Sequence, residues 1–419
     1  MDLQRPRGTQ DILPAETPIW HRVEAAAHRV AQSYGYREIR TPVFEHVEVF
    51  QRGVGDATDI VEKEMYEFED RGGRRLVLRP ESTAAVARAL QQTSLLAEPP
   101  VRLYYIQSHF RYERPQSGRL RQHTQFGVEV WGVLGPLADA EVIALAESLL
   151  TELGLKSLVV RLNSIGCTDC RPRYREALVT YLSGHRGELC GDCQRRLERN
   201  PLRVLDCKVP GCQAVVAGGP KPLDHLCEAC ETHLAGVESA LEALGITYEC
   251  DGSLVRGLDY YSRTVFEIGY EKLGAQSTVC GGGRYDGLME SLGGKPQPAV
   301  GFGLGLERLI LTLAGEGLLP PGESPVDVYV AYLGEDLGPE AMRLARMLRE
   351  AGQRVEMEAL GRSLKAQLRR AQKLLAPFVV ILGPQELARG VVMVRNMKTS
   401  AQAEVPIEQL AAAFENQTA

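Results

Sequence analysis

The sequence lacks any apolar stretch long enough to cross a membrane, because no run of about 18 apolar residues occurs in its 419 positions. The N-terminal segment MDLQRPRGTQDILPAE lacks the apolar core of a secretory signal. An excess of positive charge is also missing: 48 Lys and Arg stand against 54 Asp and Glu, for a net charge of −6. We therefore expect a cytoplasmic protein with no membrane contact, in which any binding of nucleic acid depends on local basic patches.

What is present is an ordinary globular composition, with 44% hydrophobic and 24% charged residues, over a length that suits two to four domains. The ten cysteines are unevenly distributed, and most lie in one part of the chain. They include three CxxC pairs and two further residues between the second and third pairs: Cys167/Cys170, Cys190/Cys193, Cys207, Cys212 and Cys227/Cys230. In a cytosolic chain such pairs indicate a metal site or reduced thiols rather than disulfides.

The stretch 101–132 predicts two strands joined by a cationic loop. Alternation on the first strand places four polar side chains on one face: Gln107, His109, Arg111 and Glu113. On the second strand it separates a polar face from a core face: Gln125, Gly127 and Glu129 against Phe126, Val128 and Val130. The loop contributes Arg114, Arg119 and Arg121. Because guanidinium groups bind phosphate bidentately, this face can hold a small zwitterion and a phosphate, although an exposed polar sheet face is the alternative.

The region before this hairpin predicts a helix over 19–34, a strand interrupted by Pro42 and a short strand over 76–78. The chain then turns directly into an apolar helix over 84–90, and Ser82 or Thr83 is expected to cap it. Glu81 lies at this strand-to-helix corner, where its carboxylate can face a pocket.

The region after the hairpin predicts a helix over 139–153 and then an Arg- and Cys-rich block over 155–250, which we interpret as an insertion or lid. A glycine-rich turn is expected over 280–287, followed by a strand over 299–304 and a helix over 306–313. Arg308 falls in the first turn of that helix. After a Pro-rich linker, 326–419 predicts a small α/β domain, with strands over 326–333, 354–358, 378–382, 391–395 and 402–406 and helices over 338–351, 363–374 and 407–415.

Four motifs together resemble the class II aminoacyl-tRNA synthetases, and within them the histidyl-tRNA synthetase family: FRYERPQSGRLRQHTQFGVE, AVGFGLGLERLI, RGLDYYSRTVFE and CGGGRYDGL. The strand that ends at Pro42 resembles the class's first motif, which implies a homodimer. The resemblance implies an α/β protein with an α+β catalytic core: an antiparallel sheet flanked by helices, a helical insertion and a C-terminal α/β anticodon-binding domain. It implies catalytic segments over 1–154 and 251–320, the insertion over 155–250 and the anticodon-binding domain over 326–419.

The resemblance also implies roles for individual residues. Histidine would be bound by Glu81, Ser82, Thr83, Arg111, Gln125, Glu129, Arg256, Tyr260 and Tyr261, and Arg256 and Arg111 would act in catalysis. ATP would be bound by Arg111, Glu113, Arg119 and Arg308. The tRNA would be contacted by Arg114, Gln116 and Arg121, and by a basic helix face in the terminal domain with Arg362, Lys365 and Arg369. Ser82 departs from the glycine found in many relatives.

The implied reaction is ATP-dependent ligation of L-histidine to tRNA(His) through a histidyl-adenylate, with release of AMP and pyrophosphate. Mg²⁺ would bridge the β- and γ-phosphates, while Arg256 would stand where other class II enzymes place a metal. The chemistry requires positioning and cationic stabilisation more than proton transfer. The alternatives are a non-catalytic regulatory paralogue of histidine biosynthesis and a class II synthetase for another amino acid.

Several motifs keep a structural alternative. Arg256 and Arg111 could be partners in ion pairs, Tyr260 and Tyr261 could be core aromatics, and the glycine cluster could be a tight hairpin. Spacing alone favours a structural zinc held by Cys190, Cys193, Cys227 and Cys230, with Cys207 able to replace a member of either pair. The family resemblance does not imply zinc in this region, so a vestigial site stays open.

Overall fold

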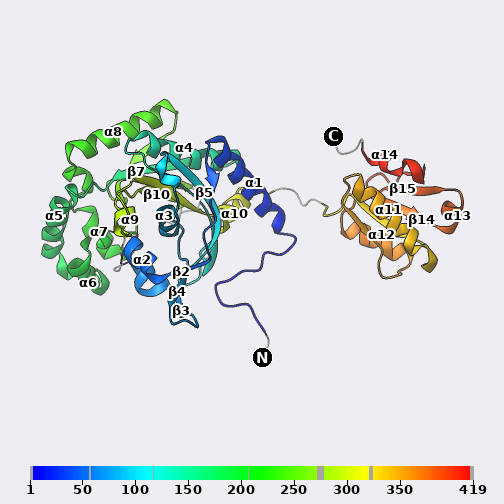
Figure 1. The fold of residues 1–419 in the computed structure, drawn as a ribbon, viewed down its shortest axis with the longest axis horizontal. Coiled ribbons are helices and arrows are strands. Elements are labelled where there is room, and N and C mark those ends of the chain that lie inside the picture. The colour runs from blue at the N-terminus through cyan, green and yellow to red at the C-terminus, as the bar shows by residue number, and fades with distance from the viewer. Residues whose placement is uncertain are drawn as a thin grey trace. The chain divides into compact units, whose positions relative to one another are not determined.

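The structure is a computed structural model that describes residues 3–55, 58–116, 118–205, 207–270, 278–319 and 324–415. The chain divides into two compact units, residues 1–319 and 320–419, each with its own hydrophobic core. Figure 1 shows both units, with the N-terminal unit built around one large twisted sheet.

That sheet has eight strands in the order β1-β5-β6-β11-β10-β9-β7-β8. Every neighbouring pair is antiparallel except β1 with β5 and β7 with β8, which are parallel pairs at the two edges. The strands, in sheet order, are β1 Arg37–Glu38, β5 Val101–Phe110, β6 Gln122–Trp131, β11 Ala299–Gly305, β10 Thr278–Arg284, β9 Ser262–Tyr270, β7 Leu158–Ser164 and β8 Tyr248–Cys250. The predicted hairpin is therefore β5–β6, and it pairs with strands that lie far along the chain.

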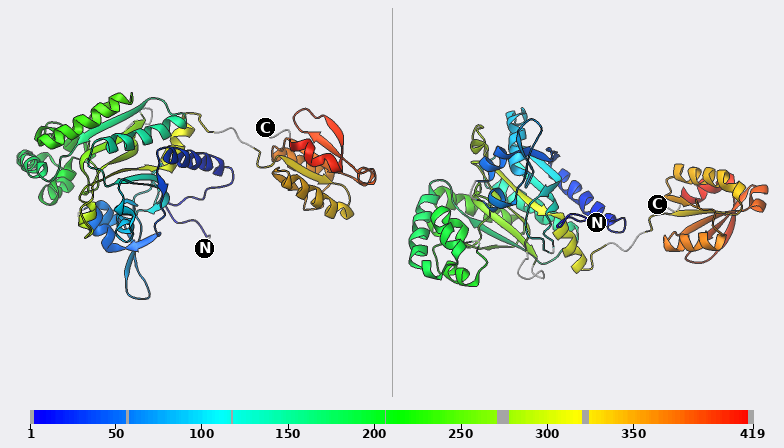
Figure 2. Two further views of the ribbon diagram at one scale, coloured as in Figure 1. Left: turned by 45° about the horizontal axis from the view of Figure 1, so that its top comes forward. Right: turned by 90° about the horizontal axis from the view of Figure 1, so that it is seen from below.

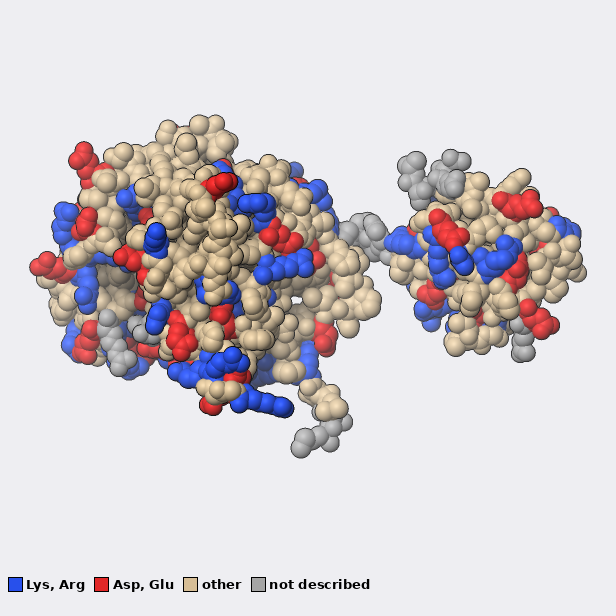
Figure 3. Space-filling view, in the orientation of Figure 1, with Lys and Arg blue, Asp and Glu red and all other residues tan. Residues whose placement is uncertain are grey.

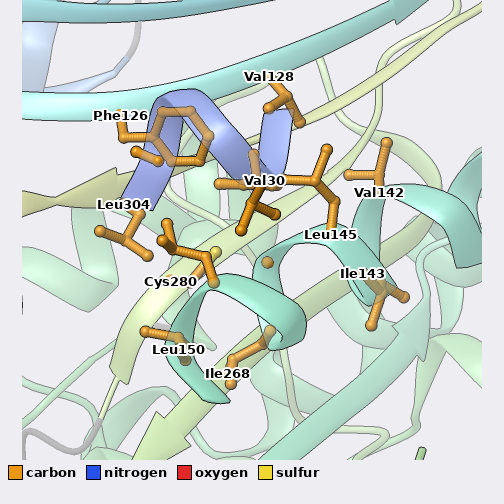
Figure 4. Close-up of a cluster of buried hydrophobic side chains, with 14 of the residues drawn as sticks. Val30, Phe126, Val128, Val142, Ile143, Leu145, Leu150, Ile268, Cys280 and Leu304 are labelled. Atoms are coloured by element: carbon orange, nitrogen blue, oxygen red, sulfur yellow. The ribbon is translucent and has the colours of Figure 1, made fainter. Parts of the chain in front are cut away.

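One face of the sheet is covered by four helices: α1 Thr17–Ser33, α4 Leu137–Glu152, α8 Glu228–Ala243 and α10 Leu306–Gly315. The predicted core face of β6 packs against them, since Phe126, Val128 and Val130 are fully buried in this cluster. Figure 4 shows part of this cluster, with side chains of α1 and α4 packed against side chains from strands of the large sheet. This packing leaves the opposite face of the sheet for polar residues.

The opposite face is partly covered by α3 Thr83–Gln91 and α9 Leu288–Ser291, with α2 Val47–Val54 beside them. A three-stranded sheet lies next to α2, in the order β2-β4-β3, with β2 Phe44–His46, β3 Tyr66–Glu69 and β4 Arg75–Leu78. The strand expected around Pro42 is thus two strands in two different sheets, because proline cannot donate the hydrogen bond that a continuous ladder requires.

Between β7 and β8 the chain forms helices α5 Cys170–Gly184, α6 Gly191–Arg199, α7 Pro210–Ala217 and α8, seen at one end of the unit in Figure 2. The strands that flank these helices, β7 and β8, belong to the large sheet. α8 also covers the large sheet, because its Val237 and Leu241 are buried in the same core. Its His233 ring lies 3.2 Å from the Asp139 carboxylate of α4. Asp139 in turn forms a fully buried ion pair with Arg284 of β10, which locks helix, insertion and sheet together.

The C-terminal unit has a five-stranded sheet in the order β13-β12-β14-β15-β16. Its elements are β12 Val328–Tyr332, α11 Gly338–Glu350, β13 Val355–Met357, α12 Leu364–Lys373, β14 Phe378–Leu382, α13 Pro384–Ala388, β15 Val391–Asn396, β16 Gln402–Pro406 and α14 Leu410–Glu415. The predictions for β14 and β16 are confirmed to the residue, while the short helix α13 was not anticipated.

The surface carries both signs of charge. Acidic and basic side chains are interspersed over the face of each unit shown in Figure 3, in agreement with the small net charge of −6. Among the described residues, no helix has the length and apolar character that crossing a bilayer requires.

Candidate active site

Three central strands place glycines side by side on the face of the sheet opposite α1 and α4. In register across β6, β11 and β10, Gly127 pairs with Gly303, and Gly303 pairs with Gly281. Tyr105 of β5 and Glu267 of β9 stand at the two ends of this row. Without side chains the row forms a flat floor, on which neighbouring side chains and a ligand can lie directly against the backbone.

The expectation of a turn over 280–287 is wrong for its first half. Residues 280–284 belong to β10, which hydrogen-bonds to β11 on one side and to β9 on the other. A glycine cluster usually interrupts a strand, because glycine has no side chain to pack on the sheet. Here the side chains of the two flanking strands provide that packing. The tight-hairpin alternative is excluded by the same pairing.

Arg256 lies on this floor. A Cβ atom added to Gly281 would come within 2.4–2.6 Å of three atoms of the Arg256 guanidinium, so the guanidinium lies flat over the glycine. Its Nη1 forms an ion pair with Glu267, and the other Glu267 oxygen accepts a 2.6 Å hydrogen bond from the Thr278 hydroxyl. Within the described residues the buried Nε of Arg256 has no partner. Arg256 is therefore a partner in an ion pair, as the structural alternative predicts, but only through Nη1. Its Nε stays available to a ligand.

Glu129 is the second charged group on the floor. Its Oε1 accepts hydrogen bonds from the Thr83 hydroxyl at 2.8 Å and the Tyr105 hydroxyl at 3.3 Å. Its Oε2 is buried and, in the part of the chain that the structure describes, unpaired, as is the Tyr285 hydroxyl. Both atoms would lie 2.7 Å from a Cβ at Gly301. Burial raises the pKa of Glu129 well above its usual range, because desolvation disfavours the charged form.

Glu81 shapes the corner between β4 and α3. Its two carboxylate oxygens accept 2.8 Å hydrogen bonds from the backbone N–H groups of Thr83 and Ala84. The prediction that Ser82 or Thr83 caps this helix is therefore wrong, because the longer Glu81 side chain reaches the free N–H groups instead. The Ser82 hydroxyl lies 2.7 Å from the His109 ring, and Thr83 reaches toward Glu129.

An aromatic cluster closes the site. The ring centres of Tyr260 and Tyr261 are 4.7 Å apart, Tyr285 lies 5.4 Å from Tyr260, and the Arg256 guanidinium lies 6.0 Å from the ring of Tyr261. Sequence reasoning missed Tyr285 and Tyr105. Tyr105 could have been found by extending the period-two alternation from Gln107 by one step. Tyr285 lies inside the CGGGRYDGL motif, but nothing in its spacing assigned it a role.

A cationic group lies beyond the ends of β5 and β6. Glu113 lies 3.9 Å from Arg111 and 3.6 Å from Arg119, and the Arg111 Nε donates to the Pro80 carbonyl at 2.8 Å. Arg308 donates to the Thr278 carbonyl at 2.8 Å. Burial and the nearby charge of Arg119 lower the pKa of Arg308. Concentrated positive charge of this kind suits a polyphosphate.

The other residues predicted to contact nucleic acid lie in two different parts of the chain, the hairpin loop and the C-terminal unit. Arg114 and Gln116 are exposed on the hairpin loop, whereas Arg121 lies 3.7 Å over the ring of Tyr112 and donates its backbone N–H to Gly8. In the C-terminal unit, Arg362 pairs with Glu358 at 2.9 Å. A separate groove of about 390 Å³ lies beside α12 and is lined by Leu364, Lys365, Leu368, Arg369, Gln372, Arg395 and Met397.

The cysteines do not group as the spacing suggested. Cys190 and Cys193 meet Cys207 and Cys212, whereas Cys227 and Cys230 meet Cys167 and Cys170. A single site built from Cys190, Cys193, Cys227 and Cys230 is therefore wrong, because the fold brings each CxxC pair to different partners. The remaining two, Cys250 and Cys280, lie outside both groups.

A glycine-floored antiparallel sheet, with an arginine-rich hairpin and a paired arginine at its centre, defines the catalytic core of a class II aminoacyl-tRNA synthetase. The family model described as Histidyl-tRNA synthetase matches residues 8–309, and the one described as Anticodon binding domain matches residues 327–417. The chain belongs to the histidyl-tRNA synthetase family.

Relatives agree over nearly the whole chain. A histidine–tRNA ligase of Moorella thermoacetica is 54% identical over 404 residues, 96% of each chain. The apo structure of Staphylococcus aureus histidyl-tRNA synthetase matches with a TM-score of 0.84 and 36% identity, over 99% of this chain and 100% of that one. A Bacillus halodurans structure, titled ATP phosphoribosyltransferase regulatory subunit/histidyl-tRNA synthetase, has a TM-score of 0.64, 23% identity and coverage of 91% of this chain and 98% of that one. That last likeness shows the fold alone.

Proposed function

We propose that this chain ligates L-histidine to tRNA(His) in two steps. The histidine carboxylate attacks the α-phosphorus of ATP, pyrophosphate leaves, and the histidyl-adenylate then passes its aminoacyl group to the 3′-terminal ribose of the tRNA, releasing AMP. The observation that best supports this is a pair of buried polar atoms on one glycine floor, Glu129 Oε2 and Arg256 Nε, which have no partner within the described part of the chain. They complement the ammonium group of an amino acid and the anionic centre where its carboxylate meets phosphate.

Histidine recognition falls to the residues above the floor. Glu129 and Gln125 hold the α-ammonium group, since both lie along the glycines of β11. Glu81, Ser82 and Thr83 line the pocket, and Tyr260 and Tyr261 enclose the imidazole. Polar pockets of this kind reject analogues by roughly 10⁴–10⁵, because a mismatched ligand leaves buried groups unpaired.

Catalysis falls to Arg256 and Arg111, which stabilise the charge that develops on the α-phosphate. Arg308 and Arg119 bind the distal phosphates, and Glu113 keeps the nearby guanidinium groups oriented through its two ion pairs. Bound together with ATP, Mg²⁺ would supply further positive charge at the phosphates beside Arg308 and Arg119. The chain's own contribution is to position the reacting groups and to aim fixed positive charge at the phosphorus.

The tRNA is held at two places. Arg114 and Gln116 on the exposed hairpin loop, together with Arg121 at its base, contact the acceptor end. The groove beside α12 accepts an anticodon base, with Lys365, Arg369 and Arg395 around it, and Arg362 contributes a further tRNA contact. We assign catalysis to residues 1–154 and 251–320, a lid to 155–250 and anticodon recognition to 326–419, in a cytoplasmic enzyme.

The active form is a homodimer. Val43 and Phe44 are 45% and 54% exposed next to Pro42, in the segment that resembles the class's interface motif. Burying such side chains against a second copy removes apolar surface from water. Light scattering of Phe44→Glu is expected to show monomers where the unaltered chain shows dimers, and a dimeric Phe44→Glu would place the interface elsewhere.

The first experiment is histidine-dependent exchange of pyrophosphate into ATP. We expect exchange with histidine alone among the amino acids, and a loss of about 10³–10⁵-fold in Arg256→Ala. Arg29→Ala is the control, because Arg29 is an exposed arginine that pairs with Glu152. Histidine binding without exchange in the unaltered chain would overturn ligation and favour the regulatory paralogue, which the match of 327–417 to the anticodon-binding domain disfavours.

A further inference from the structure

Eight of the ten cysteines form two compact groups that the ligation chemistry does not use. The first thiol cluster contains Cys167, Cys170, Cys227 and Cys230, and the second contains Cys190, Cys193, Cys207 and Cys212. Within each cluster the four sulfur atoms all lie within 4.8 Å of one another. All eight are free thiols, and five of them are buried.

The sulfur–sulfur distances match the edge of a zinc tetrathiolate. Cys167 lies 3.7 Å from Cys170 and 3.8 Å from Cys227, and Cys190 lies 3.9 Å from Cys207. Four sulfurs placed tetrahedrally at about 2.3 Å from Zn²⁺ are separated by about 3.8 Å. A disulfide needs about 2.05 Å, and an iron–sulfur cluster, with several iron atoms, holds its thiolates further apart. The spacing therefore selects a single tetrahedral ion.

In each cluster a backbone N–H group donates a hydrogen bond to a sulfur atom, an arrangement that stabilises thiolates. The N–H of Cys227 donates to the Cys170 sulfur at 3.1 Å, and the N–H of Cys190 donates to the Cys212 sulfur at 3.2 Å. Hydrogen bonds of this kind orient metal ligands and stabilise their negative charge. Cys227 and Cys190 are also the N-cap residues of α8 and α6, where the helix dipole favours an anion. Both clusters share this construction although they lie on different helices.

The part of the insertion formed by α5, α6 and α7 has a small core of its own. Its buried members are Tyr174, six aliphatic side chains and three thiols of the second thiol cluster, Cys193, Cys207 and Cys212. A core this small supplies limited stability, and domains of this size often obtain the rest from a structural metal. Bringing four free thiols together without an ion would gain almost nothing.

We propose that each thiol cluster binds one structural Zn²⁺, so that the insertion is a two-zinc module. The first site fastens the start of α5 to the start of α8. The second fastens α6 to α7. Both ions are fully ligated by protein, so neither takes part in histidine activation.

The two sites also position the histidine-binding loop. Next to the first thiol cluster, the Ile165 N–H donates to the Arg263 carbonyl, and the Arg263 N–H donates to the Gly166 carbonyl, both at 2.8 Å. Near the second, the Asn200 amide donates to Asp259 at 3.1 Å. Tyr260 and Tyr261 lie between these two tethers. The metal module therefore holds both ends of the segment that encloses the substrate ring.

Metal analysis of the full chain, purified from zinc-supplied cells without chelator, tests the proposal. We expect two Zn²⁺ per chain, and one each in Cys167→Ser/Cys170→Ser and Cys190→Ser/Cys193→Ser. Cys250→Ser is the matched control and keeps two, because its exposed sulfur belongs to neither cluster. Replacing the zinc with Co²⁺ is expected to give the absorption bands of tetrahedral cobalt thiolate.

A second measurement needs no variant to fold. Titrating the unaltered chain with a mercurial while a colorimetric chelator reports free Zn²⁺ is expected to release two ions as the cluster thiols react. A chain free of zinc whose thiols react at once would overturn the proposal, as would disulfides within the clusters. If the unaltered chain held one ion, the variants would show which proposed site is wrong. The cluster whose cysteines can be replaced without loss of that ion would not bind zinc.

Discussion

Glu129 is a buried carboxylate with one oxygen satisfied by Thr83 and Tyr105, while the other has no partner among the residues that the structure describes. If that oxygen receives the substrate's ammonium group, Glu129→Gln removes the charge but keeps the shape. We expect the KM for histidine to rise by roughly 10²-fold, since breaking a buried charge pair costs about 2–5 kcal/mol, while the KM for ATP stays unchanged. Steady-state exchange assays measure both constants. The exposed Glu48→Gln is the control, and an equal rise in both KM values would contradict the assignment.

Glu307 makes stability depend on pH. Its carboxylate accepts a 2.7 Å hydrogen bond from the Thr124 N–H, and burial raises its pKa to about 7. The folded state then binds the proton more tightly than the unfolded state. Its contribution to stability is full below about pH 4.5 and is lost as the pH rises through 7.

Glu307→Gln tests this effect, because glutamine imitates the protonated form. Between pH 5 and 8, the free energy of unfolding of the unaltered chain is expected to fall by roughly 1–3 kcal/mol more than that of the variant. Denaturant unfolding across this pH range gives the comparison. Parallel pH profiles would show that Glu307 titrates normally.

At the level of single elements, β10 depends on having no side chain at Gly281. A methyl group there would meet the Arg256 guanidinium at 2.4 Å, whereas the same change at Gly287, in the same motif, meets no atom of the described residues within 4 Å. Gly281→Ala is therefore expected to displace Arg256 and to lower kcat for exchange by roughly 10²-fold, and Gly287→Ala to leave it unchanged. Circular dichroism of both variants checks that the sheet survives. Equal activities would show that Arg256 does not depend on the floor.

Periodicity predicted most of the strands and helices, because alternation and helical spacing are local properties. The strands of the β5–β6 hairpin and the terminal unit were found in this way. The errors lie where a distant partner decides the structure. The glycine segment of β10 is a strand only because β9 and β11 flank it. The packing of α5–α8 determines which cysteine pairs lie together. The motif resemblance predicted individual residues of the site. The glycine floor on which they lie could be recognised only from the register of the sheet.

At the scale of the whole molecule, we expect histidine activation in the N-terminal unit and anticodon recognition in the C-terminal unit. Lys365 and Arg369 line the groove beside α12, in a unit that has its own core and contains no part of the glycine floor. Lys365→Ala/Arg369→Ala is expected to raise the KM for tRNA by roughly tenfold or more, because two phosphate or base contacts are lost, with pyrophosphate exchange unchanged. Aminoacylation of tRNA measures the effect, and Arg346→Ala/Arg349→Ala on α11 is the control. An unaffected KM for tRNA would place anticodon recognition outside this groove.

The strand order also decides when during translation the site can form. β11 lies between β6 and β10, so the inner edge of the β5–β6 hairpin has no partner until residues 299–305 have left the ribosome. Through the synthesis of everything from Trp131 to Ala299, that edge remains open to pairing with other chains. A nascent chain of this enzyme is therefore exposed to mispairing while that segment is synthesised, and it can recognise histidine only once its first unit is almost complete.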